Sequence, residues 1–331
     1  MKIETIKFNG KELVLLDQTK LPFEELFIVT NDYNRIAEAI ERLEVRGAPA
    51  IGVTAAYALA IEYLHNESEV DLYKAYERLK STRPTAVNLF NTLQIMILYF
   101  EANKNSKSLK SELIALAKKI HQEDFESCEK IALHGIEIFS KPLNIITHCN
   151  TGALATAGEG TALNVIKYGF SRGLVKKVFV DETRPLLQGS RLTAYELDKE
   201  GIPFEIITDS MAASLMKADK IDIAITGADR IALNGDSANK IGTYSLAINS
   251  QYHKIPFYIV APESTFDPVS LTGDEFIIEQ RNGKEIAFFR NNAITKETYN
   301  FYNPSFDVTP CQLITGIITD KQLYRFPYNF K

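Results

Sequence analysis

The stretch Leu143-Asn144-Ile145-Ile146-Thr147-His148-Cys149 is a short apolar run that ends in a histidine and a cysteine. Stretches with helical spacing separate it from four later runs of similar length, at residues 177–181, 204–208, 221–225 and 257–261. Apolar runs that alternate with helices are typical of βαβ units, in which buried strands form a parallel sheet. Residues 141–331 are therefore predicted to form a Rossmann-like, doubly wound catalytic domain.

The residues before this part follow another pattern. Two β-type runs flank Asn9-Gly10, a pair that favours a hairpin because both residues tolerate positive φ. From Asp32 onward, apolar residues recur with helical spacing near Ile36–Leu43 and over residues 50–64, 72–79, 87–100 and 109–139. The predicted fold class is therefore α/β, with a small N-terminal β-hairpin and helical-bundle domain over residues 1–140 preceding the Rossmann-like domain.

Composition excludes several classes of protein. The chain has 331 residues and a formal net charge of -5, which argues against a dedicated nucleic-acid binder. Its three cysteines lack the spacing of a disulfide framework or a zinc site. The first residues do not resemble a signal peptide, and no apolar stretch approaches the length needed to cross a bilayer. We expect a cytoplasmic protein that binds neither membrane nor nucleic acid.

Polar and reactive side chains follow the predicted strands. In an open parallel sheet, ligands bind beyond the carboxyl ends of the strands. The segments at those ends are His148-Cys149-Asn150, Asp181-Glu182-Thr183-Arg184, Thr208-Asp209-Ser210 and Gly227-Ala228-Asp229-Arg230. A purely structural sheet needs only turn residues there, so this clustering predicts an active site.

Three of these side chains have two interpretations each. Cys149 is either a small buried hydrophobe or a reactive thiol, which a following helix N-terminus would activate. Asp229 is either a helix N-cap or a general acid whose pKa is raised in a closed pocket. His148 is either a hydrogen-bonded structural histidine or a catalytic one. The other cysteines, Cys128 and Cys311, are expected to be structural.

Two arginines precede predicted helices. Arg46 stands before Gly47-Ala48-Pro49, and Arg83 stands before Pro84-Thr85. A guanidinium beside the free N–H groups of a helix start suits a phosphate. The alternative is a pair of solvated surface arginines.

Common nucleotide and metal motifs are absent from the sequence. It contains no P-loop, no His-Glu-x-x-His and no Gly-x-Ser-x-Gly. Gly158-Glu159-Gly160 begins a dinucleotide-binding fingerprint, but Leu163 occupies the third glycine position. Asp181 lies about where a ribose-binding acid would stand, so a nicotinamide-dependent dehydrogenase remains a competitor on pattern. The broken fingerprint argues against it, and we predict no metal and no cofactor.

Longer motifs around these residues resemble the 5-methylthioribose-1-phosphate isomerase family over nearly the whole chain. They are Val45-Arg46-Gly47-Ala48-Pro49-Ala50-Ile51-Gly52, Arg83-Pro84-Thr85-Ala86-Val87-Asn88-Leu89 and Thr147-His148-Cys149-Asn150-Thr151-Gly152, together with residues 181–189, 227–243 and 306–310. Residues 273–302 depart from the family pattern.

The resemblance implies an aldose–ketose isomerase that converts 5-methylthioribose 1-phosphate to 5-methylthioribulose 1-phosphate in methionine salvage. It implies a homodimer whose catalytic pair is Cys149 and Asp229. Its implied substrate contacts are Arg46, Gly47, Ala48, Arg83, Gln188, Asn239 and Lys240. Two alternatives stay open. Similar isomerases act on 5-deoxyribose 1-phosphate or ribose 1,5-bisphosphate, and more distant relatives are non-catalytic subunits of translation initiation factor 2B.

Overall fold

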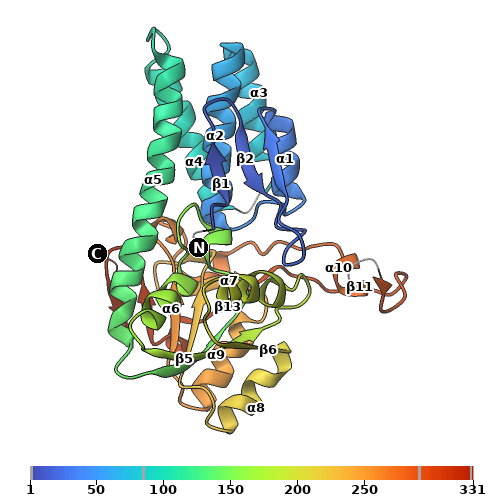
Figure 1. Cartoon of the computed structure of the whole chain (residues 1–331), viewed down its shortest axis with the longest axis vertical. Coiled ribbons are helices and arrows are strands. Elements are labelled where there is room, and N and C mark those ends of the chain that lie inside the picture. Colours follow the sequence, from blue (N-terminus) through green and yellow to red (C-terminus); the bar gives the residue numbers. More distant parts are fainter. Residues whose placement is uncertain (1–2, 84–85, 290–291, 329, 331) are drawn as a thin grey trace. The chain divides into compact units, whose positions relative to one another are not determined.

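The computed structural model describes residues 3–83, 86–289, 292–328 and 330 (Figure 1). The chain divides into two compact units, one of residues 1–130 with 151–160 and the other of residues 131–150 with 161–331. This division differs from the predicted single boundary at residue 140. Its first boundary, after residue 130, lies inside the long helix of residues 109–135, and residues 151–160 are assigned to the first unit. Packing alone does not test which part folds independently, so the 1–140 and 141–331 domains stay a prediction.

The first unit begins with a three-stranded antiparallel sheet of β1 (Ile6–Phe8), β2 (Leu13–Leu16) and β3 (Phe27–Thr30). The predicted hairpin is present, but Phe8 pairs with Leu13, so its loop has four residues instead of an Asn-Gly turn. The Asn9 side chain accepts the N–H groups of Lys11 and Glu12 and thereby closes this longer loop.

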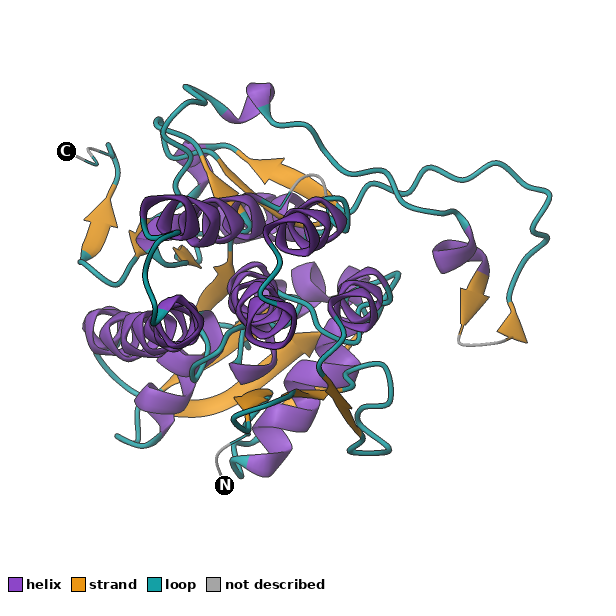
Figure 2. Ribbon diagram, turned by 90° about the horizontal axis from the view of Figure 1, so that it is seen from above, coloured by secondary structure: helices purple, strands orange, loops and turns teal. Residues whose placement is uncertain are grey.

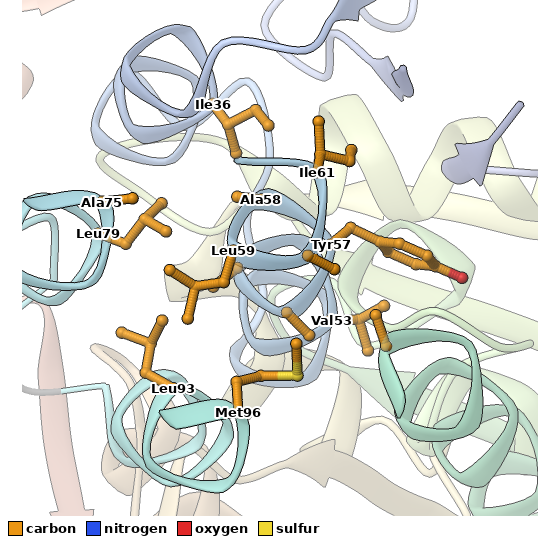
Figure 3. Close-up of a cluster of buried hydrophobic side chains, with 14 of the residues drawn as sticks. Ile36, Val53, Tyr57, Ala58, Leu59, Ile61, Ala75, Leu79, Leu93 and Met96 are labelled. Carbon is orange, nitrogen blue, oxygen red and sulfur yellow. The ribbon is translucent and has the colours of Figure 1, made fainter. Parts of the chain in front are cut away.

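The helices of this unit are α1 (Tyr33–Glu41), α2 (Ala48–Asn66), α3 (Glu69–Lys80), α4 (Val87–Ala102) and α5 (Leu109–Gly135), with α5 continued by η1 (Ile136–Ile138). Helix α2 is apolar around most of its circumference, which requires neighbours on all sides. Figure 3 shows Leu59 of α2 among Leu79 of α3, Leu93 and Met96 of α4, while Ile36 of α1 approaches from another side. The predicted helical bundle is thus built around α2.

The second unit contains a seven-stranded sheet in the order β15-β14-β10-β7-β4-β5-β6. Its strands are β4 (Leu143–Thr147), β5 (Val175–Asp181), β6 (Phe204–Ile207), β7 (Ile223–Gly227), β10 (Phe257–Val260), β14 (Gly316–Ile318) and β15 (Leu323–Arg325). The first six are parallel, in the 3-2-1-4-5-6 order of a Rossmann sheet, and only β15 is antiparallel. The fold class is confirmed. The pattern of the sequence missed β14 and β15.

Helices cover both faces of this sheet, which explains why the strands are apolar throughout. Side chains such as Ile145 pack with α6 (Ala162–Phe170) and α7 (Ala194–Lys199). The next residue, Ile146, points to the opposite face, which α8 (Ala212–Lys217) and α9 (Thr243–Tyr252) cover. No helix among the described residues is long and apolar enough to span a membrane.

A smaller antiparallel sheet carries part of the predicted site. It consists of β13 (Phe306–Thr309), β9 (Ser237–Lys240) and β8 (Arg230–Ile231). Between β10 and β13, helix α10 (Lys284–Ala287) and the strands β11 (Phe288–Phe289) and β12 (Asn292–Ala293) lie at the tip of two long extended segments (Figure 2). This excursion coincides with residues 273–302, where the sequence departs from the family motifs.

Candidate active site

The predicted catalytic pair lies at the point where the strand order of the large sheet reverses. Strands β4 and β7 are parallel neighbours, but the chain continues from β4 to β5 on one side and from β7 to β10 on the other. Doubly wound proteins bind ligands at this switch point. Cys149 stands two residues after β4, and Asp229 stands two residues after β7. Cys149 and Asp229 are 80 positions apart in the sequence, but both therefore lie at the same edge of the sheet, just beyond two adjacent strands.

Cys149 adopts an unusual backbone conformation. Its φ is +63°, in the left-handed region that residues other than glycine seldom occupy, and its side chain is buried. Such conformations cluster at functional sites, where the surroundings enforce them. The helix predicted after Cys149, near residues 162–169, is present as α6 (Ala162–Phe170), which begins thirteen residues after Cys149. Activation of the Cys149 thiol by a helix N-terminus therefore stays a prediction.

Asp229 precedes the strand β8 and not a helix, so its interpretation as a helix N-cap is wrong. Its N–H donates to the carbonyl of Ala238 over 2.8 Å, and the next residue, Arg230, pairs with Ala238. The β8–β9 hairpin thus returns Asn239 and Lys240 to the side of Asp229. The structure brings these three predicted residues together.

Asn239 and Lys240 are held by several contacts. The buried Asn239 amide donates to Thr243 Oγ1 over 2.8 Å. Lys240 Nζ donates to the carbonyl of Ser305 over 3.0 Å and lies 4.5 Å from the centre of the Phe306 ring. Thr243 is the first residue of α9, whereas Ser305 and Phe306 lie at the start of β13. The position of Lys240 therefore depends on residues about 65 positions downstream.

Gln188 lies at the start of a π-helical turn, η3 (Gly189–Thr193), an irregularity often found at functional sites. Its side chain is 6% exposed, and its Oε1 makes no hydrogen bond within the described part of the chain. Because buried polar atoms nearly always have partners, this oxygen indicates a place for a ligand donor. Gly189 permits the turn, since a Cβ there would lie 1.7 Å from the Asp181 carbonyl oxygen.

Arg46 and Arg83 belong to the first unit. Arg46 precedes Gly47, the N-cap of α2, whose first turn holds Ala48 and Pro49. Arg83 precedes α4, whose N-cap is Ala86, although Pro84 and Thr85 of the predicted turn lie outside the described residues. The two helix starts pack together, because a Cβ at Gly52 would lie 2.9 Å from Thr92 Oγ1 and 3.3 Å from the Asn88 carbonyl oxygen. Arg46 and Arg83 therefore precede the starts of two adjacent helices, and the phosphate site predicted there stays a prediction.

We expect Gly47→Ala to destabilise the protein by about 1–3 kcal/mol, the usual effect of overpacking. Gly47 has a φ of +95°, and a Cβ on it would lie 2.2 Å from the Ala155 carbonyl oxygen. Gly10→Ala is a matched control, because Gly10 has a similar φ of +103° and no atom within 4 Å of such a Cβ. Urea denaturation measures both. Equal losses of stability would show that backbone conformation, and not the contact with Ala155, dominates at Gly47.

His148 lies in a buried ion pair beside Cys149. Its Nδ1 is 2.9 Å from Asp181 Oδ2, and its Nε2 is 2.9 Å from the carbonyl oxygen of Ile241. Burial lowers the pKa of His148, but the Asp181 carboxylate outweighs burial and holds that pKa above its ordinary value of 6.5. Both ring nitrogens therefore act as donors, which favours the structural interpretation of this histidine.

The oxygens of Asp209 lie near the same pair, so three metal-ligand side chains gather within 4.8 Å. The His148 nitrogens already face oxygen acceptors. Asp209 Oδ1 and Oδ2 accept the N–H groups of Thr183 and Arg184 over 2.7 and 2.8 Å. These hydrogen bonds form a network that ties the ends of β4, β5 and β6 together.

The remaining cysteines are in inert surroundings. Cys128 is buried in α5, and burial raises the pKa of its thiol to about 12. Burial also raises the pKa of Cys311, with Asp236 adding to the effect. A thiol that stays protonated at neutral pH is a poor nucleophile, in agreement with the structural roles predicted for both.

Residues 44–323 match the initiation factor 2 subunit family. The chain belongs to this family. It is 46% identical over 98% of its length to the methylthioribose-1-phosphate isomerase of Carboxydothermus hydrogenoformans, 97% of which is covered. The resemblance recognised in the sequence motifs is thus confirmed.

Two solved structures extend this comparison. The crystal structure of 5-methylthioribose 1-phosphate isomerase from Pyrococcus horikoshii OT3 is similar with a TM-score of 0.93 and 39% identity, over 99% of this chain and 94% of that one. The translation initiation factor eIF-2B subunit delta from A. fulgidus is similar with a TM-score of 0.86 and 37% identity, over 99% of this chain and 97% of that one. The proteins similar to this chain therefore include one named as an isomerase and one named as a translation initiation factor subunit.

Proposed function

We propose that this protein is an aldose–ketose isomerase that converts 5-methylthioribose 1-phosphate to 5-methylthioribulose 1-phosphate. The observation that carries the proposal is the placement of Cys149 and Asp229 on adjacent strands at the switch point of the sheet. The names of the most similar relatives support the choice of substrate. We further propose that it acts in methionine salvage, as a cytoplasmic homodimer that needs neither metal nor nucleotide.

The chemistry sets two tasks for the protein. A phosphate on the anomeric carbon prevents simple ring opening, so the ring oxygen must receive a proton as its bond to that carbon breaks. Asp229 is the proposed general acid. A hydrogen must then move from C2 to C1 while the C2 hydroxyl loses its proton, so that the electrons of that O–H bond form the second bond of the ketone. Cys149 would carry this proton through an enediol intermediate, or a hydride would move directly while both side chains transfer only oxygen-bound protons.

Substrate binding is assigned to the polar groups around this pair and to the arginines. Arg46 and Arg83, with the N–H groups of Gly47 and Ala48 at the start of α2, would bind the phosphate. Gln188, with its buried unbonded oxygen, would accept a hydrogen bond from a sugar hydroxyl. Asn239 and Lys240 would complete the contacts, and such fixed contacts raise the rate by orienting the reacting atoms.

The decisive experiment measures turnover of three sugar 1-phosphates by the purified protein, with 5-methylthio, 5-deoxy and 5-phosphate groups, in the presence of a chelator. We expect the highest kcat/KM for the methylthio sugar. Preference for another sugar would retain the isomerase chemistry and change the pathway. No turnover of any of the three would refute the enzyme proposal and favour a role as a translation initiation factor subunit, which is what the A. fulgidus protein is named.

A further inference from the structure

Both backbone polar groups of Cys149 are hydrogen-bonded to threonine side chains. The Cys149 N–H donates to Thr183 Oγ1 over 2.9 Å, and the Cys149 carbonyl accepts from Thr193 Oγ1 over 2.6 Å. Thr183 comes from the loop after β5, whereas Thr193 ends the π-helical turn η3. Two separate segments therefore hold the backbone of Cys149, one at its N–H and the other at its carbonyl.

The geometry fixes the orientation of each hydroxyl. Thr183 Oγ1 accepts from Cys149 and donates to the Asp181 carbonyl over 2.9 Å. Thr193 Oγ1 donates to the Cys149 carbonyl and accepts from the Asn150 amide over 3.2 Å. Both threonines are almost fully buried, with 0% and 1% of their surfaces exposed. Each hydroxyl thus makes one bond as donor and one as acceptor in a site that excludes water.

The two threonines are themselves held in place. The N–H of Thr183, which has a φ of +65°, donates to Asp209 Oδ1 over 2.7 Å. In η3 the N–H of Ala194 bonds to the carbonyl of Gly189, five residues earlier, in place of the four-residue step of an α-helix. Gln188 precedes the first residue of this wider turn, and Thr193 is its last residue. The same irregularity therefore places a proposed substrate contact and a contact to Cys149.

We propose that Thr183 and Thr193 are positioning residues that hold Cys149 in the left-handed conformation and so fix the direction in which its thiol leaves the backbone. We call the pair of hydrogen bonds from Thr183 and Thr193 to Cys149 the clamp. The effect of the clamp on catalysis rests on the proposed function, but the clamp itself is a property of the folded chain. A residue in a rarely populated conformation keeps it only where the surroundings enforce it. The two hydroxyls supply that enforcement through four defined hydrogen bonds.

The test uses Thr183→Val and Thr193→Val, which keep side-chain shape and remove the hydroxyl. We expect each to lower kcat for the methylthio sugar about 10–100-fold, with little change in KM, because displacement of a catalytic group by about 1 Å has an effect of this size. We also expect iodoacetamide to alkylate Cys149 at a rate changed at least about fivefold, measured by mass spectrometry of the Cys149 peptide. Thr183→Ser and Thr193→Ser keep the hydroxyl and should restore both readouts.

Thr54→Val is the matched control. Thr54 is fully buried in α2, and its Oγ1 makes no hydrogen bond within the described residues, so this variant removes a buried hydroxyl without breaking a bond. The clamp is refuted if Thr183→Val and Thr193→Val behave like Thr54→Val in both readouts, or if the serine variants lose as much as the valine variants. If one valine variant does not fold, the other decides. If the wild-type protein turns over no sugar, the proposed function fails, and the alkylation rates still test the clamp.

Discussion

Replacing Asp229 with asparagine is expected to lower kcat about 10²–10⁴-fold, the range usually supplied by a general acid. The amide is nearly isosteric with the carboxyl but cannot release a proton to the ring oxygen. The backbone contacts of Asp229, including the bond from its N–H to Ala238, are kept, so the fold should survive. Substrate binding depends mainly on other residues in the proposed site, so KM should change much less than kcat.

Steady-state kinetics with the methylthio sugar measures this effect, and circular dichroism checks the fold. Asp222→Asn is the matched control, since Asp222 lies at the opposite end of β7 and accepts the N–H of Asn144. Cys149→Ser should also lose most turnover. Full activity of either Asp229→Asn or Cys149→Ser would remove that residue from the catalytic pair.

Replacing His148 with alanine is expected to lower the free energy of unfolding by about 3–5 kcal/mol, because it leaves the buried Asp181 carboxylate without its charged partner. The bond from His148 Nε2 to the Ile241 carbonyl is lost as well. Adding Asp181→Asn to this variant should recover part of the stability, since it removes the uncompensated charge. Urea denaturation of the single and double variants measures both effects.

The loss at His148 should also depend on pH. A histidine whose pKa is raised on folding contributes stability that is fully present below its unfolded pKa of about 6.5 and is lost as the pH rises through its folded pKa. The difference in stability between wild type and the His148→Ala/Asp181→Asn double variant should therefore be larger at pH 6 than at pH 9, because this variant leaves no buried Asp181 carboxyl, whose pKa burial raises, to oppose the effect. His134→Ala is the control, because His134 is half-buried and bonds to the uncharged Thr319 carbonyl, so a loss of about 1 kcal/mol is expected. A larger difference at pH 9 would contradict a charged His148.

Elements with a clear apolar period could be predicted from the sequence, and those without one could not. Helix α2 and strand β4 were predicted within two residues of their ends, because burial on all sides leaves an unbroken apolar run. Strands β14 and β15 have three residues each, too few for a period to show. The four-residue β1–β2 loop was missed because Asn-Gly suggests a tighter turn than the side chain of Asn9 actually closes.

The sequence by itself determined the alternation of strands and helices, and hence that the segments around Cys149 and Asp229 lie at the carboxyl edge of one sheet. Only the tertiary structure decided that β4 and β7 are neighbours, because strand order depends on long-range pairing and no local pattern records it. It likewise decided that Thr183 and Thr193 bond to Cys149, and that Asp209 holds Thr183. Single hydroxyls and carboxylates carry no periodic signal, and their role follows from what lies beside them after the chain has folded.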